Sequence, residues 1–314
     1  MSDGMALEVR ELTKRYDETV AIDRLSFSVG VGSIYGLLGP NGAGKTTTLE
    51  CIEGLRSPDG GSISVLGIDP TTRPKELWGR IGVQLQESAR GKTMTPREAI
   101  VFFSRYHQVE PRLELLDRFG LAANADKQYG SMSVGQRRRL SLALSVAHGP
   151  KLVLLDEPTA GLDVESRVEL HEMMRELRHD GTTIVLSTHD MAEAEKLCDR
   201  IGIIIAGHLA IEGSPGQITA AGDRRTKIRV ASTLASVRNH TPELPGAEPA
   251  DSPADARGDD EYAAYWSTRP ADSVAAILDY LRRNDDELVD LRVERPSLEE
   301  RFMEITTAAN GGNR

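Results

Sequence analysis

Short apolar runs of strand length dominate the first part of the chain, over residues 7–38 and 60–68, with the turn sequence SPDGG between two of them. From about Gly82 to Pro150 the character becomes helical. Within that stretch, residues 95–98 read Thr-Pro-Arg-Glu, a capping box with proline at the first helical position, which predicts a helix beginning there. Residues 164–177 carry apolar side chains at helical spacing, most simply explained by core packing: Val164, Val168, Met174 and Leu177. These patterns predict an α/β fold.

The segment Gly39–Thr46, GPNGAGKT, lies between a strand-like apolar run and a helical pattern. This is the setting of a phosphate-binding loop, in which glycines let backbone N–H groups and a helix N-terminus cradle an anion. We expect Lys45 to reach the β- and γ-phosphates of a nucleotide and the Thr46 hydroxyl to coordinate Mg²⁺. The residues predicted to contact nucleotide here are Gly39, Pro40, Asn41, Gly42, Ala43, Gly44, Lys45, Thr46 and Thr47.

Residues 151–158, KLVLLDEP, place two carboxylates directly after a continuous apolar run. The pattern is typical of a buried parallel strand that delivers acids to its carboxyl end, where open sheets bind ligands. We expect Asp156 to hold Mg²⁺ and Glu157 to polarise the attacking water. Successive residues leaving a strand point in different directions, so the two acids can take separate roles.

With these two motifs the chain resembles the ATP-binding cassette (ABC) family, and further motifs follow in that family's order. Gln86, in IGVQLQES, matches the glutamine that the family uses to touch Mg²⁺ and the attacking water. SMSVGQ, residues 131–136, resembles the family signature: it departs from the usual pattern at Met132 and Val134 and keeps its serine, second glycine and glutamine. Gly161-Leu162-Asp163 looks like the D-loop, His189 like the switch histidine, and Tyr16 like the aromatic residue that stacks on adenine.

The resemblance implies ATP and Mg²⁺ as cofactors and an ABC ATPase fold, a mixed sheet core with a helical subdomain at about residues 87–150. The implied catalytic residues are Glu157, His189 and Gln86, and the implied metal ligands are Thr46, Gln86 and Asp156. The other implied nucleotide contacts are Tyr16, Ser133, Gly135, Gln136 and Asp163.

The signature segment also predicts a dimer. Residues 133–150 read as a helix opened by small residues and broken at Gly149-Pro150, and its N-terminus offers N–H groups to an anion. In the family that anion is the γ-phosphate of an ATP held by the other subunit. The chain has one copy of each motif, so the second cassette is a separate chain; a homodimer is the economical choice and a heterodimer the alternative. Of the arginines at 137–139 we expect at most one or two to make specific contacts.

Composition agrees with an energy-coupling subunit. No window approaches eighteen consecutive apolar residues, and the N-terminus has no apolar signal region. Cys51 and Cys198 read as buried free thiols. The net charge of −10 without a basic cluster argues against nucleic acid as the main partner. We therefore expect a cytoplasmic protein on the inner face of the membrane, bound to a separate permease. The aromatics of residues 101–106 could dock on that permease, although burial in the core is the commoner case.

After about residue 222 the character changes, which predicts a cassette at 1–222 and a small α+β appendage at 223–314. Residues 241–261 hold seven acids against one arginine and predict a loop or linker. Residues 297–300 form another capping box. The closing PSLEERFMEIT resembles the tail of ABC-2 type exporter ATPases, a group that includes daunorubicin-resistance proteins. We interpret the appendage as a dimerisation or regulatory element.

The function predicted is an ATPase subunit that powers an ABC-2 type exporter through its permease. Two other classes of protein fit the sequence less well. A kinase or GTPase would not need the signature segment, and no guanine-reading motif follows the phosphate loop. A cassette protein acting on ribosomes or nucleic acid is the stronger alternative, but the ribosomal type carries two cassettes in one chain and the DNA type a long coiled coil. The transported substrate stays open, because the permease selects it.

Overall fold

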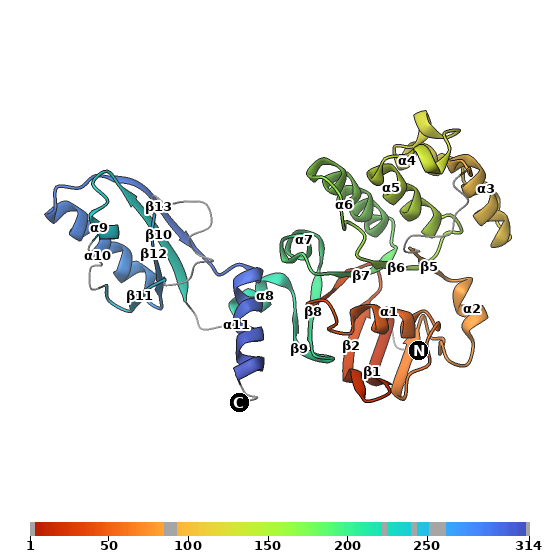
Figure 1. The fold of residues 1–314 in the computed structure, drawn as a ribbon, viewed down its shortest axis with the longest axis horizontal. Coiled ribbons are helices and arrows are strands. Elements are labelled where there is room, and N and C mark those ends of the chain that lie inside the picture. Colours follow the sequence, from red (N-terminus) through yellow and green to blue (C-terminus); the bar gives the residue numbers. More distant parts are fainter. Residues whose placement is uncertain (1–3, 85–92, 222–224, 240–243, 251–261, 312–314) are drawn as a thin grey trace. The chain divides into compact units, whose positions relative to one another are not determined.

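The computed structural model describes residues 4–84, 93–221, 225–239, 244–250 and 262–311. The chain divides into two units, Met1–Pro215 and Gly216–Arg314, whereas the sequence predicts a boundary after residue 222. Figure 1 shows the elements of both. Within the described ranges, no helix is long and apolar enough to cross a lipid bilayer.

A six-stranded mixed sheet forms the centre of the first unit, in the order β5-β6-β7-β3-β8-β9 (Figure 1). Its strands are β3 (Ile34–Leu38), β5 (Ile81–Val83), β6 (Leu152–Asp156), β7 (Thr183–Thr188), β8 (Arg200–Ile205) and β9 (His208–Gly213). All neighbours are parallel except β9, which pairs antiparallel with β8. Every residue of β3 and β7 is buried, as expected for parallel strands covered on both faces.

The first unit also contains an antiparallel sheet, in the order β2-β1-β4. It consists of β1 (Met5–Tyr16), β2 (Thr19–Gly30) and β4 (Gly60–Val65). Its apolar side chains share one core with helix α1 (Lys45–Ile52) and the central strands. The phosphate-loop helix is therefore anchored by side chains from both sheets.

The described residues of the first unit form six further helices: α2 (Pro74–Trp78), α3 (Pro96–Tyr106), α4 (Glu114–Arg118), α5 (Val134–Ser145), α6 (Val164–His179) and α7 (Met191–Leu197). Two 3-10 turns, Ala122–Asn124 and Tyr129–Ser131, lie between α4 and α5. Helix α3 packs against α5, which in turn packs against β5 and α6. The predicted helical character of the middle of the chain is confirmed.

The capping box at the start of α3 is confirmed, since Thr95 and Glu98 exchange both bonds. The expectation that α3 hides most of its aromatics is wrong. Phe102 is 55% exposed and Tyr106 is 71% exposed, because the buried face is built from smaller side chains: Pro96, Ala99, Ile100 and Ser104.

Three other sequence predictions need correction. Helix α5 ends at Ser145, before Gly149-Pro150. Val164 and Val168 of α6 are 78% and 54% exposed, so the inward face of that helix comes from residues nearer its end, such as Met174. The three consecutive arginines all have partners within the chain, mostly backbone carbonyls: Arg137 with Tyr129 and Gly130, Arg138 with Ala160, and Arg139 with the Glu169 carboxylate.

The second unit has an antiparallel sheet in the order β11-β12-β10-β13. Its elements are α8 (Pro215–Ala220), β10 (Thr226–Ser232), α9 (Ser236–Asn239), β11 (Ala247–Pro249), β12 (Ala263–Ser267), α10 (Pro270–Arg283), β13 (Leu288–Glu294) and α11 (Leu298–Gly311). Ile228, Tyr265 and Ile277 lie in its core. The α+β character and the capping box at residues 297–300 are confirmed.

Strand β11 corrects the prediction that residues 241–261 form only a loop, because Ala247–Pro249 pair with β12. Of that stretch, only residues 244–250 lie within the described ranges. The two cysteines, Cys51 and Cys198, are free and buried as expected.

Candidate active site

Three neighbouring strands end at the same edge of the central sheet and carry the predicted site residues. Strand β3 leads into the phosphate loop, β6 ends at Asp156, and β7 ends directly before His189. The pairing register aligns Leu38 with Thr188 and Asp156 with Ser187. The carboxyl edge of the sheet thus holds three segments that are far apart in sequence.

The phosphate loop passes so close to neighbouring backbone that two of its glycines could not carry a side chain. A Cβ added to Gly39 would lie 2.3 Å from the carbonyl oxygen of Ile204, and one added to Gly44, at φ +105°, would lie 2.5 Å from that of Ala21. Gly42 also has a positive φ, of +81°, but a Cβ added there would meet no atom within 4 Å. The loop therefore has free space at Gly42 and packs against backbone at Gly39 and Gly44, an arrangement that suits a phosphate-binding loop.

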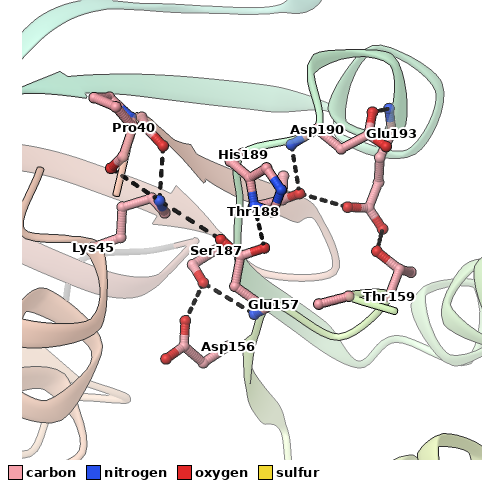
Figure 2. A network of polar contacts seen from close by, with 12 residues as sticks. Pro40, Lys45, Asp156, Glu157, Thr159, Ser187, Thr188, His189, Asp190 and Glu193 are labelled. Carbon is pink, nitrogen blue, oxygen red and sulfur yellow. Dashed lines mark hydrogen bonds and ion pairs between the residues drawn. The ribbon is translucent and has the colours of Figure 1, made fainter. Parts of the chain in front are cut away.

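Lys45 begins helix α1, and its buried side chain turns back over the loop. The ammonium Nζ donates to the carbonyl oxygens of Gly39, at 2.7 Å, and Pro40, at 3.3 Å. It also lies 3.6 Å from Oε1 of Glu157 (Figure 2). A cation is therefore held at the mouth of the loop, where it can meet phosphate oxygens.

The Asp156 carboxylate accepts hydrogen bonds from two hydroxyl groups. Thr46 Oγ1 donates to its Oδ2 at 3.0 Å, and Ser187 Oγ donates to its Oδ1. The hydroxyl of Thr46 and the carboxylate of Asp156 form an oxygen pair of the kind that Mg²⁺ prefers. The donor set therefore fits the metal that the sequence implies.

Glu157 has a left-handed backbone, with φ +47°, which is uncommon for a residue with a side chain. Its N–H donates to the Oγ and the carbonyl oxygen of Ser187, at 3.1 and 3.2 Å, and these bonds hold the turn. The side chain then points away from that of Asp156 and joins Lys45 and His189 (Figure 2). His189 Nδ1 lies 2.8 Å from Glu157 Oε2.

Two residues near the site were missed by the sequence reasoning. Ser187 donates a hydrogen bond to the Asp156 carboxylate and accepts one from the N–H of Glu157. Its only sequence signal is its place near the end of β7. Glu53 ends helix α1 and is 8% exposed. Its burial first, and then the nearby carboxylates of Asp156 and Glu50, raise the pKa of Glu53 to about 8.

The signature residues open helix α5. Ser133 is its N-cap and exchanges both capping-box bonds with Gln136, so both side chains are engaged in the cap. Gly135 faces the start of α6, where an added Cβ would lie 2.6 Å from Ser166 Oγ. Asp163 caps α6 by accepting from the N–H and Oγ of Ser166, both at 2.9 Å, and these bonds lower the pKa of the Asp163 carboxyl.

The remaining predicted residues lie apart from this cluster. Tyr16 ends β1 at the surface, with the Lys14 ammonium 5.7 Å and the Arg56 guanidinium 5.3 Å from its ring centroid. Gln86 lies outside the described residues. Among the residues that the structure does describe, no hydrogen bond or ion pair joins Ser133, Gln136 or Asp163 to Lys45 or Glu157. In contrast, Lys45, Thr46, Asp156, Glu157 and His189 form one connected group, in which Ser187 joins Asp156 to Glu157.

A phosphate loop beside two acids at the edge of a parallel sheet defines a P-loop nucleotide hydrolase. The family model described as ABC transporter matches residues 22–160. The chain is 36% identical to the daunorubicin resistance ATP-binding protein of Streptomyces coeruleorubidus, over 97% of this chain and 96% of that protein. The chain therefore belongs to the ABC transporter family, among its ATP-binding subunits, and its activity is ATP hydrolysis.

Other relatives agree with this assignment. The Nod factor export ATP-binding protein I of Burkholderia orbicola is 42% identical over 67% of this chain and 71% of that protein. Among solved structures, an ATP-binding subunit of an ABC transporter matches with a TM-score of 0.63 and 27% identity, over 69% of this chain and 92% of that chain. Clostridium perfringens cbiO1, part of the ABC transporter complex cbiONQ, matches with the same TM-score and coverage at 28% identity. The predicted family and fold class are confirmed.

Proposed function

We propose that the site works with Mg²⁺ and that Glu157 is its general base. The observation that carries this proposal is the position of the Glu157 carboxylate between Lys45 and His189, beside the oxygen pair of Thr46 and Asp156. Bound Mg²⁺ would neutralise charge on the nucleotide phosphates. Thr46 and Asp156 would hold it, together with Gln86 from the sequence pattern.

The chain's own side chains then divide the work. Lys45 exchanges the loop carbonyls and Glu157 for phosphate oxygens, which releases the carboxylate to accept a proton from water. His189 keeps that carboxylate oriented through its Nδ1 contact. Tyr16, at the surface, is the proposed stacking partner of the adenine ring.

The signature residues of one chain act on the ATP that is bound by a second copy of the chain. Ser133, Gly135 and Gln136 lie at the N-terminus of α5, and Asp163 at that of α6, beside exposed apolar side chains: Val134, Val164 and Val168. Apolar side chains exposed next to a helix N-terminus suit an interface that closes over a partner's ATP. A head-to-tail homodimer supplies that partner with one kind of chain.

The dimer powers an exporter by binding a separate permease at the inner face of the membrane. Phe102 and Tyr106, exposed on α3, are the proposed docking side chains. Export as the direction follows from the relatives, whose names describe drug resistance and Nod factor export. The same relatives disfavour a cassette that acts on ribosomes or nucleic acid.

Glu157→Gln tests the general base. It should keep ATP binding, lower kcat by about 10² to 10⁴ and accumulate an ATP-bound dimer in gel filtration. Glu195→Gln, an exposed residue of α7, is the matched control and should behave as wild type. Near-normal turnover of Glu157→Gln would remove Glu157 from the chemistry.

Mixing two inactive variants tests the head-to-tail dimer. Lys45→Ala destroys the phosphate loop and Ser133→Arg blocks the signature, so neither homodimer should hydrolyse ATP. A mixed dimer keeps one complete site, because an intact loop of one chain meets an intact signature of the other. With random pairing the mixture should recover about a quarter of wild-type turnover. A mixture as inactive as its components would contradict the arrangement.

A further inference from the structure

Glu193 of helix α7 has a buried carboxylate whose described hydrogen-bond partners all lie outside the connected group around Lys45. It is 2% exposed. Its Oε1 accepts from Thr159 Oγ1 at 2.7 Å and lies 2.9 Å from His171 Nε2, and its Oε2 accepts from Thr188 Oγ1 at 2.6 Å. Figure 2 shows this carboxylate between Thr159 and Thr188. Donors at both oxygens satisfy a polar group that would otherwise be costly to bury.

The three partners of Glu193 lie on segments that carry site residues. Thr159 follows Glu157 by two positions, on the segment that leads to Asp163. Thr188 directly precedes His189. His171 lies on α6, the helix that Asp163 caps. A single carboxylate therefore joins the segment after β6, the end of β7 and helix α6.

Asp190, on the other side of His189, is fixed by the same elements. Its N–H donates to Thr188 Oγ1 at 3.0 Å, and its Oδ1 accepts from the N–H of Glu193 at 2.9 Å. Arg167 Nη1 donates to its Oδ2 at 2.9 Å. Because Arg167 and His171 are four residues apart, one face of α6 holds both. His189 is thus flanked by two residues that hydrogen bonds link to α6, Asp190 directly through Arg167 and Thr188 through Glu193 and His171.

We propose that Glu193 is a positioning residue for ATP hydrolysis. It fixes the backbone of His189 relative to Glu157 and couples both to the segment that ends at Asp163. This inference rests on the proposed role of His189. Asp163 lies in the proposed dimer interface, so closure of the dimer is transmitted to His189 through Thr159 and α6.

The first test is Glu193→Ala. Removal of the carboxylate leaves three donors without an acceptor and frees the His189 segment, so kcat should fall by about 10- to 100-fold. The KM for ATP should stay within about twofold, because none of the described hydrogen bonds of the Glu193 carboxylate involves a phosphate-loop residue. Glu193→Gln should recover part of kcat, since an amide oxygen still accepts. Glu195→Ala, exposed on the same helix, is the control and should change neither value.

The second test combines the change with His189→Ala. If Glu193 acts through His189, Glu193→Ala should lower kcat in the wild-type background and cause no further loss in His189→Ala. Equal losses in both backgrounds, or an unchanged kcat of Glu193→Ala, would overturn the inference. A normal kcat of His189→Ala alone would instead overturn the proposed role of His189. If Glu193→Ala does not fold, kcat of Glu193→Gln and of Thr188→Val is compared in the wild-type and His189→Ala backgrounds in the same way. The melting temperature of every variant is measured alongside.

Discussion

The raised pKa of Glu53 predicts a loss of stability as pH rises. Burial, with Asp156 and Glu50 nearby, raises this pKa from its ordinary value of 4.5 to about 8. Between these values the folded protein holds a proton that the unfolded chain has released. The stabilising contribution is therefore fully present below about pH 4.5 and is lost as pH rises through about 8.

The size of the effect follows from the same values. The rise in the pKa of Glu53 from 4.5 to about 8 contributes at most about 5 kcal/mol to the free energy of unfolding, at about 1.4 kcal/mol for each pH unit. Between pH 5 and pH 7 the wild-type protein should lose about 2 to 3 kcal/mol of unfolding free energy relative to Glu53→Gln. Glu53→Gln carries no charge at either pH, so the comparison removes the contributions of all other titrating groups.

Tryptophan fluorescence in urea can measure this difference. The chain has two tryptophans, and Trp78 Nε1 donates to the carbonyl oxygen of Glu53 at 2.9 Å. Trp266 lies in the second unit, so Trp266→Phe leaves a signal that reports only on the unit with Glu53. Glu195→Gln serves as the control. If the wild-type and Glu53→Gln unfolding free energies change in parallel with pH, Glu53 does not titrate in this range and the reasoning is refuted.

Four further predictions concern the loop, the signature, the surface and the second unit. Lys45→Ala should abolish hydrolysis and weaken ATP binding without changing the circular dichroism spectrum, and unchanged affinity would contradict its phosphate contact. Gly135→Ala should lower the unfolding free energy by about 1–3 kcal/mol, because its Cβ would lie 2.6 Å from Ser166 Oγ; an unchanged urea midpoint would show that the contact yields freely. Phe102→Ser with Tyr106→Ser should leave basal hydrolysis intact while reducing recovery of the chain with native membranes, and full recovery would exclude these side chains from docking. A chain of residues 1–222 should still bind ATP in a titration, and limited proteolysis should cut first within the acidic stretch 241–261; failure to bind at any protein concentration would show that the second unit completes the cassette.

The sequence predicts the strand ends well because the motifs there are local. The loop Gly39–Thr46 and the acids after residue 155 follow directly from a strand, a turn and the residues that must line it. Their meeting also follows, because parallel neighbours in one sheet deliver their carboxyl ends to one edge. The structure brings Lys45, Asp156, Glu157 and His189 together on this basis.

What the sequence could not predict depends on partners from distant segments. The donors to Glu193 come from three separate elements, so no spacing rule connects them. The arginines at 137–139 bond mainly to backbone carbonyls, which carry no sequence signal of their own. The capping box at the start of α3 identified a helix but not which side faces solvent, and small buried residues decided that Phe102 and Tyr106 point outward.

The left-handed backbone of Glu157 lowers the thermal stability of the protein at the position proposed for its general base. A glycine at that position would adopt φ +47° without strain and would relieve roughly 1 kcal/mol or more. With Glu157 in its proposed role of general base, the most heat-resistant version of the fold is therefore not the version that hydrolyses ATP fastest. A laboratory selection for thermal tolerance alone should drift toward small or left-handed-tolerant residues at position 157 and lose hydrolysis as it does so.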